Sequence, residues 1–256
     1  MWGIVIDVNI IVNDLLVNYT RQGKGPVILM LHGWGDRLQT FDALAVHLSS
    51  TYEVIRLDLA GFGASQPPSE PWGLDDYADQ VDLFLKKINS RPSVIVGHSN
   101  GGAIAIRGIA SKKLEADKLV LLASAGIRLP AKGRKAAWRA ITKAGKVATA
   151  ALPVSIQNKI RTRLYASLGS DLLAVPGMEA TFKRVTSQDV QSDARHITLP
   201  TLIVSGGRDT ATPPNFAKKF HQLIDNSKLV ILDDADHFVH QSHTGEVVMA
   251  MKEFLK

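Results

Sequence analysis

The chain has 256 residues, a length that exceeds the usual single domain but that one large α/β domain often reaches. Its composition, with 45% hydrophobic and 21% charged residues and no low-complexity tract or repeat, excludes a disordered protein and a repeat array. The net charge is +6, and the absence of cysteine excludes disulfide frameworks, thiol nucleophiles and cysteine-ligated metals.

The N-terminal segment, residues 1–19, predicts two opening β-strands. It lacks the basic region and the small-residue cleavage site of a secretory signal, and polar residues interrupt it at Asp7, Asn9, Asn13 and Asp14. No run of 18 uncharged apolar residues exists anywhere in the chain, so no transmembrane segment is expected. These features favour a cytoplasmic location.

Six further apolar runs alternate with amphipathic stretches of helical length, which is the pattern of strand–helix units around a largely parallel sheet. Together with the opening pair they predict an α/β fold with an eight-stranded, mostly parallel sheet flanked by helices. The strands are expected at residues 27–31, 54–57, 93–96, 118–122, 201–205 and 228–232. The helices are expected at residues 40–48, 74–88, 100–110, 215–223 and 244–254.

One long interruption, residues 125–197, follows the sixth predicted strand. Prolines divide it into several predicted helices, and it contains no convincing strand. We interpret it as a helical lid inserted into a core formed by residues 1–124 and 198–256. Residues 124–198 hold 13 lysines and arginines against four acids, so this segment carries a charge of +9 and the remainder carries −3.

The stretch Gly97-His98-Ser99-Asn100-Gly101 follows the fifth predicted strand and opens a predicted helix. This is the pattern G-x-S-x-G in the context where a sharp turn holds a serine hydroxyl clear of the sheet edge. The start of the helix then offers free backbone N–H groups to a developing oxyanion. Glycines at such a turn can also serve tight packing alone, so the serine needs partners before it predicts catalysis.

Two downstream segments supply these partners, because a serine hydroxyl needs a base and the base needs an orienting acid. Asp209 lies just past the end of one predicted strand, and His237 lies just past the end of the next. The order Ser99, Asp209, His237, each at the carboxyl end of a separate strand, is typical of serine hydrolases built on such a sheet. Rival candidates for the acid and the base lie near His237: Asp233, Asp234, Asp236, His240 and His243.

Two more segments extend this pattern toward the N-terminus. His32-Gly33-Trp34-Gly35-Asp36 follows an early strand and is similar to the HG oxyanion loop of the α/β-hydrolase superfamily. Residues 58–65, DLAGFGAS, resemble the D-x-x-G-x-G-x-S turn of the same superfamily. The chain therefore resembles α/β-hydrolases over nearly its whole length.

The resemblance implies a role for each matched residue. Ser99 would be the nucleophile, His237 would act as general base and then as general acid, and Asp209 would orient the imidazole. The backbone N–H groups of Trp34 and Asn100 would form the oxyanion hole. The first histidine after the last strand fits the superfamily's spacing, which favours His237 over the two later histidines.

The resemblance also implies a reaction, the hydrolysis of a small-molecule carboxylic ester through an acyl-enzyme, with no metal and no organic cofactor. The chain is similar to small-molecule carboxylesterases, including the pimeloyl-carrier-protein methyl esterase group. A lactonase or a C–C bond hydrolase would use the same triad, and a ligand-binding receptor with little turnover is the alternative outside catalysis. The substrate pocket is expected to include His98, Ile127, Leu129, Trp138 and Phe238.

The basic charge of the predicted lid has two interpretations. Its first predicted helix carries Lys135, Arg139, Lys143 and Lys146 on one face. This stripe either attracts an acidic partner, such as an acyl-carrier protein or an anionic surface, or is a solvated charged face. Nucleic-acid binding is not expected, because no recognition motif is present, and the sequence leaves the oligomeric state open.

Overall fold

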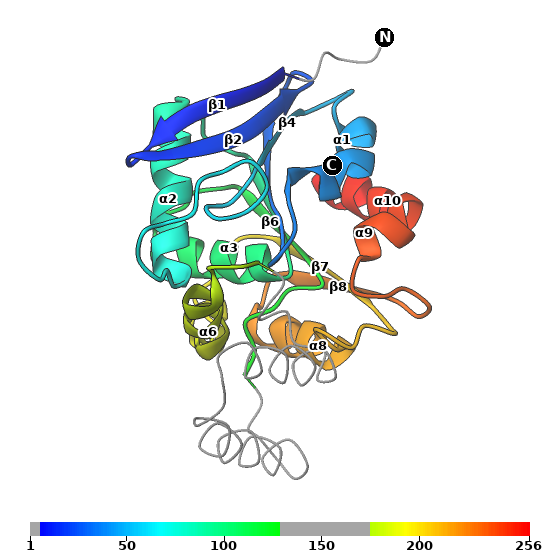
Figure 1. The fold of residues 1–256 in the computed structure, drawn as a ribbon. Helices are drawn as coiled ribbons and strands as arrows, with labels where there is room; N and C mark the ends of the chain where they lie inside the picture. The colour runs from blue at the N-terminus through cyan, green and yellow to red at the C-terminus, as the bar shows by residue number, and fades with distance from the viewer. Residues whose placement is uncertain (1–5, 129–174) are drawn as a thin grey trace, which may run out of the picture.

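The computed structural model of this protein describes residues 6–128 and 175–256, which form a sheet with helices on both faces (Figure 1). The eight strands follow the order β1-β2-β4-β3-β5-β6-β7-β8. β2 pairs antiparallel with both β1 and β4, and the neighbours from β4 through β8 are all parallel. The predicted eight-stranded, mostly parallel sheet is confirmed.

The strands are β1 (Ile6–Val12), β2 (Leu15–Gln22), β3 (Val27–Leu31), β4 (Glu53–Leu57), β5 (Val94–His98), β6 (Lys118–Leu122), β7 (Thr201–Gly206) and β8 (Ser227–Leu232). The helices are the 3-10 helix η1 (Leu38–Phe41), α1 (Asp42–Leu48), α2 (Leu74–Lys87), α3 (Asn100–Ala110), α6 (Glu179–Ser187), α7 (Gln191–Ala194), α8 (Pro214–Leu223), α9 (Val239–Ser242) and α10 (Thr244–Leu255). The elements predicted outside the lid are therefore present, most of them with ends shifted by one or two residues.

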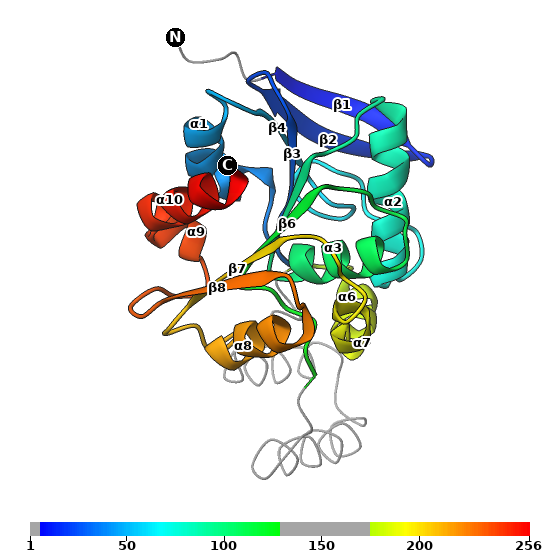
Figure 2. The same cartoon turned by 180° about the vertical axis from the view of Figure 1, so that it is seen from behind.

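Two hydrophobic cores, one on each face of the sheet, hold these elements together. Alternate residues of a strand point to opposite faces, so Leu29 and Leu31 enter one core while Ile28 and Met30 enter the other. The first core packs against α2, α3 and α8, and the second against α1 and α10. Figures 1 and 2 show these two groups of helices on opposite sides of the sheet.

The parallel strands place three loops together. β5, β7 and β8 run in the same direction, so the residues that follow them meet at one edge of the sheet. Ser99 follows β5, Asp209 lies just past β7, and His237 lies just past β8. The fold thus gathers at one edge three segments that are far apart in the sequence.

The predicted lid is described only in part. Of residues 125–197, the structure describes 125–128 and 175–197, where α6 and α7 are the expected helices. The basic stripe from Lys135 to Lys146 lies outside the described residues, and the boundaries of the lid stay a prediction. Within residues 6–128 and 175–256, the helices are too short or too polar to cross a bilayer.

Candidate active site

Ser99 occupies a strained turn between β5 and α3. Its φ of 51° and ψ of −115° lie outside the regions that non-glycine residues favour, a strain of order 1–3 kcal/mol. The turn is fixed by its backbone: the Ser99 N–H donates to the Leu122 carbonyl at 3.0 Å, and the Ser99 carbonyl accepts from the Ala125 N–H at 3.0 Å. The strand-to-helix turn predicted from the sequence is present.

Close backbone approach explains why glycines surround this serine. A Cβ atom on Gly101 would lie 2.1 Å from the Leu31 carbonyl oxygen, and one on Gly97 would lie 2.5 Å from the Gly102 Cα. Because the atoms in the way are backbone atoms of the sheet and of the helix, no side-chain movement would relieve these clashes. We refer to residues 97–102 as the elbow.

Asp209 and His237 form a hydrogen-bonded pair beside the elbow. The His237 Nδ1–H donates to Asp209 Oδ2 at 2.8 Å. A carboxylate only accepts, so the neutral imidazole carries its proton on Nδ1 and keeps a lone pair on Nε2. The Asp209 side chain is fully buried, whereas that of His237 is 19% exposed.

Further donors hold the Asp209 carboxylate in its charged form. The N–H groups of Ala211 and Thr212 donate to Oδ1 at 2.8 and 2.9 Å, and Thr212 Oγ1 lies 2.7 Å from Oδ2. Burial alone raises the pKa of Asp209, but the hydrogen bonds from His237 and Thr212 outweigh burial and lower this pKa below its usual range. The carboxylate is thus a fixed negative charge beneath the imidazole.

Two buried, neutral histidines pack behind this pair. His98 Nε2–H donates to the main-chain carbonyl of His237 at 3.0 Å, and its ring centroid lies 4.4 Å from that of His240. Burial, together with His240 and His237, lowers the pKa of His98 well below its ordinary value. Burial also lowers the pKa of His240 to about 4, and its Nε2 lies 2.9 Å from Thr40 Oγ1. Neither of these rings carries a charge near neutral pH.

The predicted oxyanion loop is held in place by a third histidine. His32 Nδ1–H donates to the Gly33 carbonyl at 2.7 Å, and His32 Nε2 accepts the Leu59 N–H at 3.0 Å. Both ring nitrogens are used, so His32 joins the segment before Trp34 to the turn after β4. Burial lowers the pKa of His32, which favours this neutral form.

A cavity of about 220 Å³ brings several of the expected site residues together. Ser99, His237, Trp34 and Asn100 all line it. Asn100 is the first residue of α3, and a backbone N–H at that position has no carbonyl within its own helix to bond. The cavity therefore combines a hydroxyl, an imidazole and a backbone donor.

The expected pocket residues fall into three groups. Ile127 lines the cavity. His98 is buried behind His237, and Phe238 is 41% exposed; neither is among the described residues that line the cavity. Leu129 and Trp138 lie outside the described residues.

Sequence reasoning missed other residues that line the cavity, Thr212, Phe182, Val185, Gln188, Phe216 and Arg128. Thr212 had a local signal, because a threonine three residues after an aspartate is placed to donate back to its carboxylate. Phe182 and Val185 had another, since they stand three apart on α6 and share one helix face. Gln188 and Phe216 carry no comparable local pattern.

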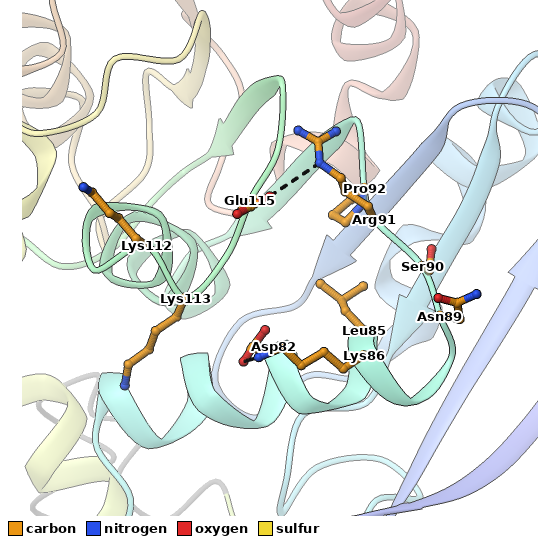
Figure 3. Close-up of a pocket in the computed structure, with 10 residues that line it drawn as sticks. All are labelled: Asp82, Leu85, Lys86, Asn89, Ser90, Arg91, Pro92, Lys112, Lys113 and Glu115. Atoms are coloured by element: carbon orange, nitrogen blue, oxygen red, sulfur yellow. Dashed lines mark hydrogen bonds and ion pairs between the residues drawn. The ribbon is translucent and has the colours of Figure 1, made fainter.

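A larger cleft of about 450 Å³ lies elsewhere, between the end of α2 and the loops beside α3 (Figure 3). Two ion pairs lie within the cleft, Lys86 with Asp82 at 2.6 Å and Arg91 with Glu115 at 3.6 Å. It borders the segment that enters β5, at the opposite end of that strand from Ser99. Among the described residues, Ser99 and His237 line the smaller cavity and not this cleft.

Known proteins resemble this chain in sequence and in fold. A model of the alpha/beta hydrolase family matches residues 28–250. A pimeloyl-[acyl-carrier protein] methyl ester esterase from Neisseria meningitidis serogroup A is 27% identical over 245 residues, which cover 90% of this chain and 76% of that protein.

Solved structures show the same fold at lower sequence identity. A bacterial membrane phospholipase A has a TM-score of 0.78 at 22% identity, with 98% of this chain and 86% of that chain covered. An enol-lactonase from Burkholderia xenovorans has a TM-score of 0.74 at 20% identity, with 97% and 99% covered. Since the family model spans most of the sequence, this chain belongs to the alpha/beta hydrolase family.

Proposed function

We propose that this hydrolase is a serine carboxylesterase that acts through an acyl-enzyme, with Ser99, His237 and Asp209 as its triad. The observation that carries the proposal is the 2.8 Å hydrogen bond from His237 Nδ1 to the buried Asp209 carboxylate. It leaves Nε2 as a base, and the imidazole that bears this atom lines the same cavity as Ser99. This is the acid–base–nucleophile arrangement that acyl transfer requires.

The first half of the reaction consumes the ester. Nε2 of His237 takes the Ser99 proton while Oγ attacks the ester carbonyl carbon, and Asp209 stabilises the imidazolium that results. The carbonyl oxygen becomes an oxyanion, which would accept hydrogen bonds from the backbone N–H groups of Trp34 and Asn100. One well-aimed donor of this kind lowers the barrier by roughly 3–4 kcal/mol. The intermediate then collapses, and the alcohol leaves with the proton from Nε2.

The second half regenerates the enzyme. His237 Nε2 removes a proton from a water molecule, and the hydroxide attacks the acyl carbon on Ser99. Collapse of the second tetrahedral intermediate releases the carboxylic acid and returns the proton to Oγ. The buried, neutral His98 serves this cycle, because it adds no like charge beside His237 when that imidazole becomes cationic.

Two further observations support a carboxylic ester as the substrate. The curated relative from Neisseria meningitidis is named as a methyl ester esterase. In addition, the walls of the cavity include Ile127, Phe182 and Val185, which suit an apolar acyl or alcohol group. Which ester is preferred is determined by the residues around the cavity and not by the triad.

The proposal is tested with a panel of p-nitrophenyl esters from acetate to laurate, assayed beside a lactone. Wild-type protein should hydrolyse at least the shorter esters, and Ser99→Ala should lower kcat by a factor of roughly 10⁴ or more. Ser50→Ala, which removes an exposed serine outside the cavity, is the matched control and should keep the wild-type rate. A fluorophosphonate should add its mass to Ser99 and should fail to label a His237→Ala variant.

Three results would contradict the proposal. Full activity of Ser99→Ala would show that the nucleophile is misassigned. Equal labelling of wild-type protein and His237→Ala would show that His237 is not the base. Hydrolysis of the lactone with no turnover of any ester would replace the carboxylesterase assignment by a lactonase.

A further inference from the structure

The cavity beside Ser99 has an unbalanced charge. Of the described residues that line it, only Arg128 and His237 can carry a positive charge, and none is acidic. His237 is needed as a neutral base before the reaction starts, so Arg128 is the permanent charge. Most of the other side chains around the cavity are apolar, including Trp34, Phe182 and Val185.

Arg128 is fixed in place through the backbone on its N-terminal side. Its N–H donates to Asp189 Oδ2 at 2.8 Å, and the carbonyl of Gly126 accepts the Val190 N–H at 2.8 Å. Between these two contacts the Ile127 side chain is buried. These contacts hold the backbone from Gly126 to Arg128 against the segment that precedes α7. The Cα atom from which the Arg128 side chain extends is therefore fixed.

The guanidinium itself has a neutral partner. Its Nη1 donates to the main-chain carbonyl of Ser187, and among the described residues it forms no ion pair with a carboxylate. The nearby Asp189 carboxylate already accepts the Arg128 N–H, the Gln191 N–H and Gln191 Nε2. A guanidinium has five N–H donors, so several remain for a ligand. Arg128 is also exposed, which places it where the cavity meets solvent.

We propose that the preferred ester carries a second, anionic group, a carboxylate, which Arg128 binds while the ester carbonyl lies at Ser99. This inference rests on the proposed esterase function. A planar guanidinium matches a carboxylate with two parallel N–H···O bonds, and the pair is strong where apolar walls reduce the competition from water. The carboxylate stays at the solvent side of the cavity, so it keeps part of its hydration while the apolar chain of the substrate lies against Phe182 and Val185.

The experiment compares charged and neutral esters of the same length. The substrates are monomethyl esters of straight-chain dicarboxylic acids from succinate to suberate, each beside its dimethyl ester. Wild-type protein should give the higher kcat/KM with the monomethyl ester at one or two chain lengths. Arg128→Gln should lower kcat/KM for that ester by about 10- to 100-fold, mainly through KM, and should change the dimethyl ester less than about twofold.

Two further variants make the test specific to the position of the charge. Arg128→Lys keeps the charge but lacks the planar guanidinium. Its kcat/KM for the monomethyl ester should lie between those of wild type and Arg128→Gln. Arg195→Gln removes an exposed arginine that does not line the cavity and should leave the ratio of charged to neutral ester unchanged. The wild-type preference should also weaken as salt is raised, because the screening length shortens.

Each outcome decides the inference. Equal loss of both ester types in Arg128→Gln would overturn it, as would a wild-type protein that prefers the dimethyl ester at every length. If Arg195→Gln also lost the preference for the monomethyl ester, that preference would come from surface charge in general, and the inference would be overturned. If p-nitrophenyl acetate is hydrolysed through Ser99 while no carboxylate preference appears, only this inference fails; if Ser99 is dispensable, the proposed function fails instead.

Discussion

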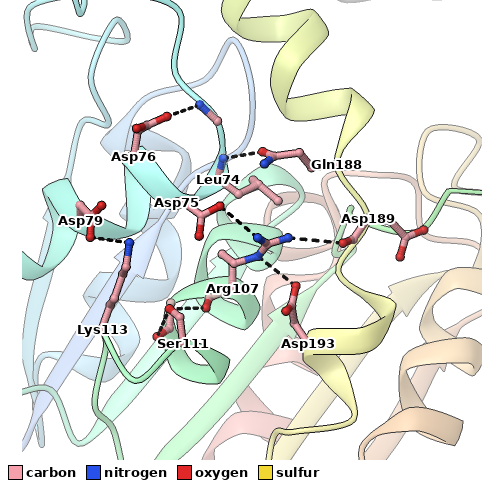
Figure 4. Close-up of polar contacts among 12 residues, drawn as sticks. Leu74, Asp75, Asp76, Asp79, Arg107, Ser111, Lys113, Gln188, Asp189 and Asp193 are labelled. Carbon is pink, nitrogen blue, oxygen red and sulfur yellow. Dashed lines mark hydrogen bonds and ion pairs between the residues drawn. The ribbon is translucent and has the colours of Figure 1, made fainter.

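The elbow and the segment at residues 175–197, which we call the wall, border the same cavity but are held by different forces. The elbow is fixed by backbone atoms, because its glycines allow the sheet and α3 to approach closely. The wall is fixed largely by side chains that reach the core across long stretches of sequence (Figure 4). Backbone packing tolerates almost no change, whereas a side-chain contact can be altered one residue at a time. The turn that holds Ser99 should therefore tolerate few substitutions, whereas single substitutions in the wall can change the shape of the cavity.

Arg107 is the centre of the contacts that hold the wall. It lies on α3, which begins directly after Ser99, and its Nε and Nη1 donate to Asp193 at 2.9 Å and to Asp75 at 3.0 Å. Beside it, Gln188 Oε1 accepts the Leu74 N–H at 2.6 Å. Figure 4 shows these residues converging from α2, α3, α7 and the segment between α6 and α7. Because Gln188 also lines the cavity, these contacts connect the core to a surface that meets the substrate.

The largest effect is expected from the substitution Gly101→Ala in the elbow. The new Cβ would lie 2.1 Å from the Leu31 carbonyl oxygen, so the sheet and α3 would have to separate. We expect a loss of about 4 kcal/mol or more in the free energy of unfolding, measured by urea denaturation. Activity should fall with it, because Ser99 depends on the same turn.

A second glycine provides the control for this prediction. A Cβ on Gly245 meets nothing within 4 Å, so Gly245→Ala should be neutral or should stabilise α10 by up to roughly 1 kcal/mol. Similar stabilities for the two variants would show that the elbow tolerates movement. The elbow would then be no more rigid than the wall.

An intermediate effect is expected from acid, which acts on the buried histidines behind the elbow. His240 has a pKa of about 4 in the folded protein and an ordinary pKa of 6.5 when unfolded, so unfolding takes up a proton between these values. The contribution of neutral His240 to stability is therefore complete above pH 6.5 and is lost as the pH falls toward 4. The expected loss is about 3 kcal/mol by linkage, on top of any other group that titrates there.

Replacing the ring isolates this contribution. His240→Gln can still reach Thr40 but does not titrate, so its stability should fall less steeply than that of wild type between pH 6.5 and pH 4. His221→Gln, which removes an exposed histidine, should keep the wild-type slope. Parallel curves for wild type and His240→Gln would mean that His240 is protonated in the folded protein in this range.

The same contrast explains what the sequence could and could not predict. The elbow was predictable because its information is local: a strand, a glycine pattern and a helix follow one another without interruption between residues 94 and 110. Asp209 and His237 were predictable because parallel strands bring their ends to one edge. The partners of Arg107 were not, because Asp193 lies 86 residues away and their meeting depends on how α7 docks on α3. His98 was expected in the pocket wall, but the structure places it behind His237, a position that depends on the tertiary packing of the loop after β8.

The smallest effect, and the one that separates stability from specificity, is expected from Arg107→Met. The residue and its acidic partners are partly exposed, so solvent screens the ion pairs and the loss of stability should be only about 1–2 kcal/mol. Lys113→Met is the matched control, because Lys113, shortly after the end of α3, also pairs with α2, at Asp79, but has no ion pair with the wall. Arg107→Met should raise KM for long-chain p-nitrophenyl esters several-fold and leave kcat on the acetate near its wild-type value, whereas Lys113→Met should change neither. If both variants shift the chain-length profile equally, the position of the wall does not depend on Arg107, and the division between a rigid elbow and an adjustable wall does not hold.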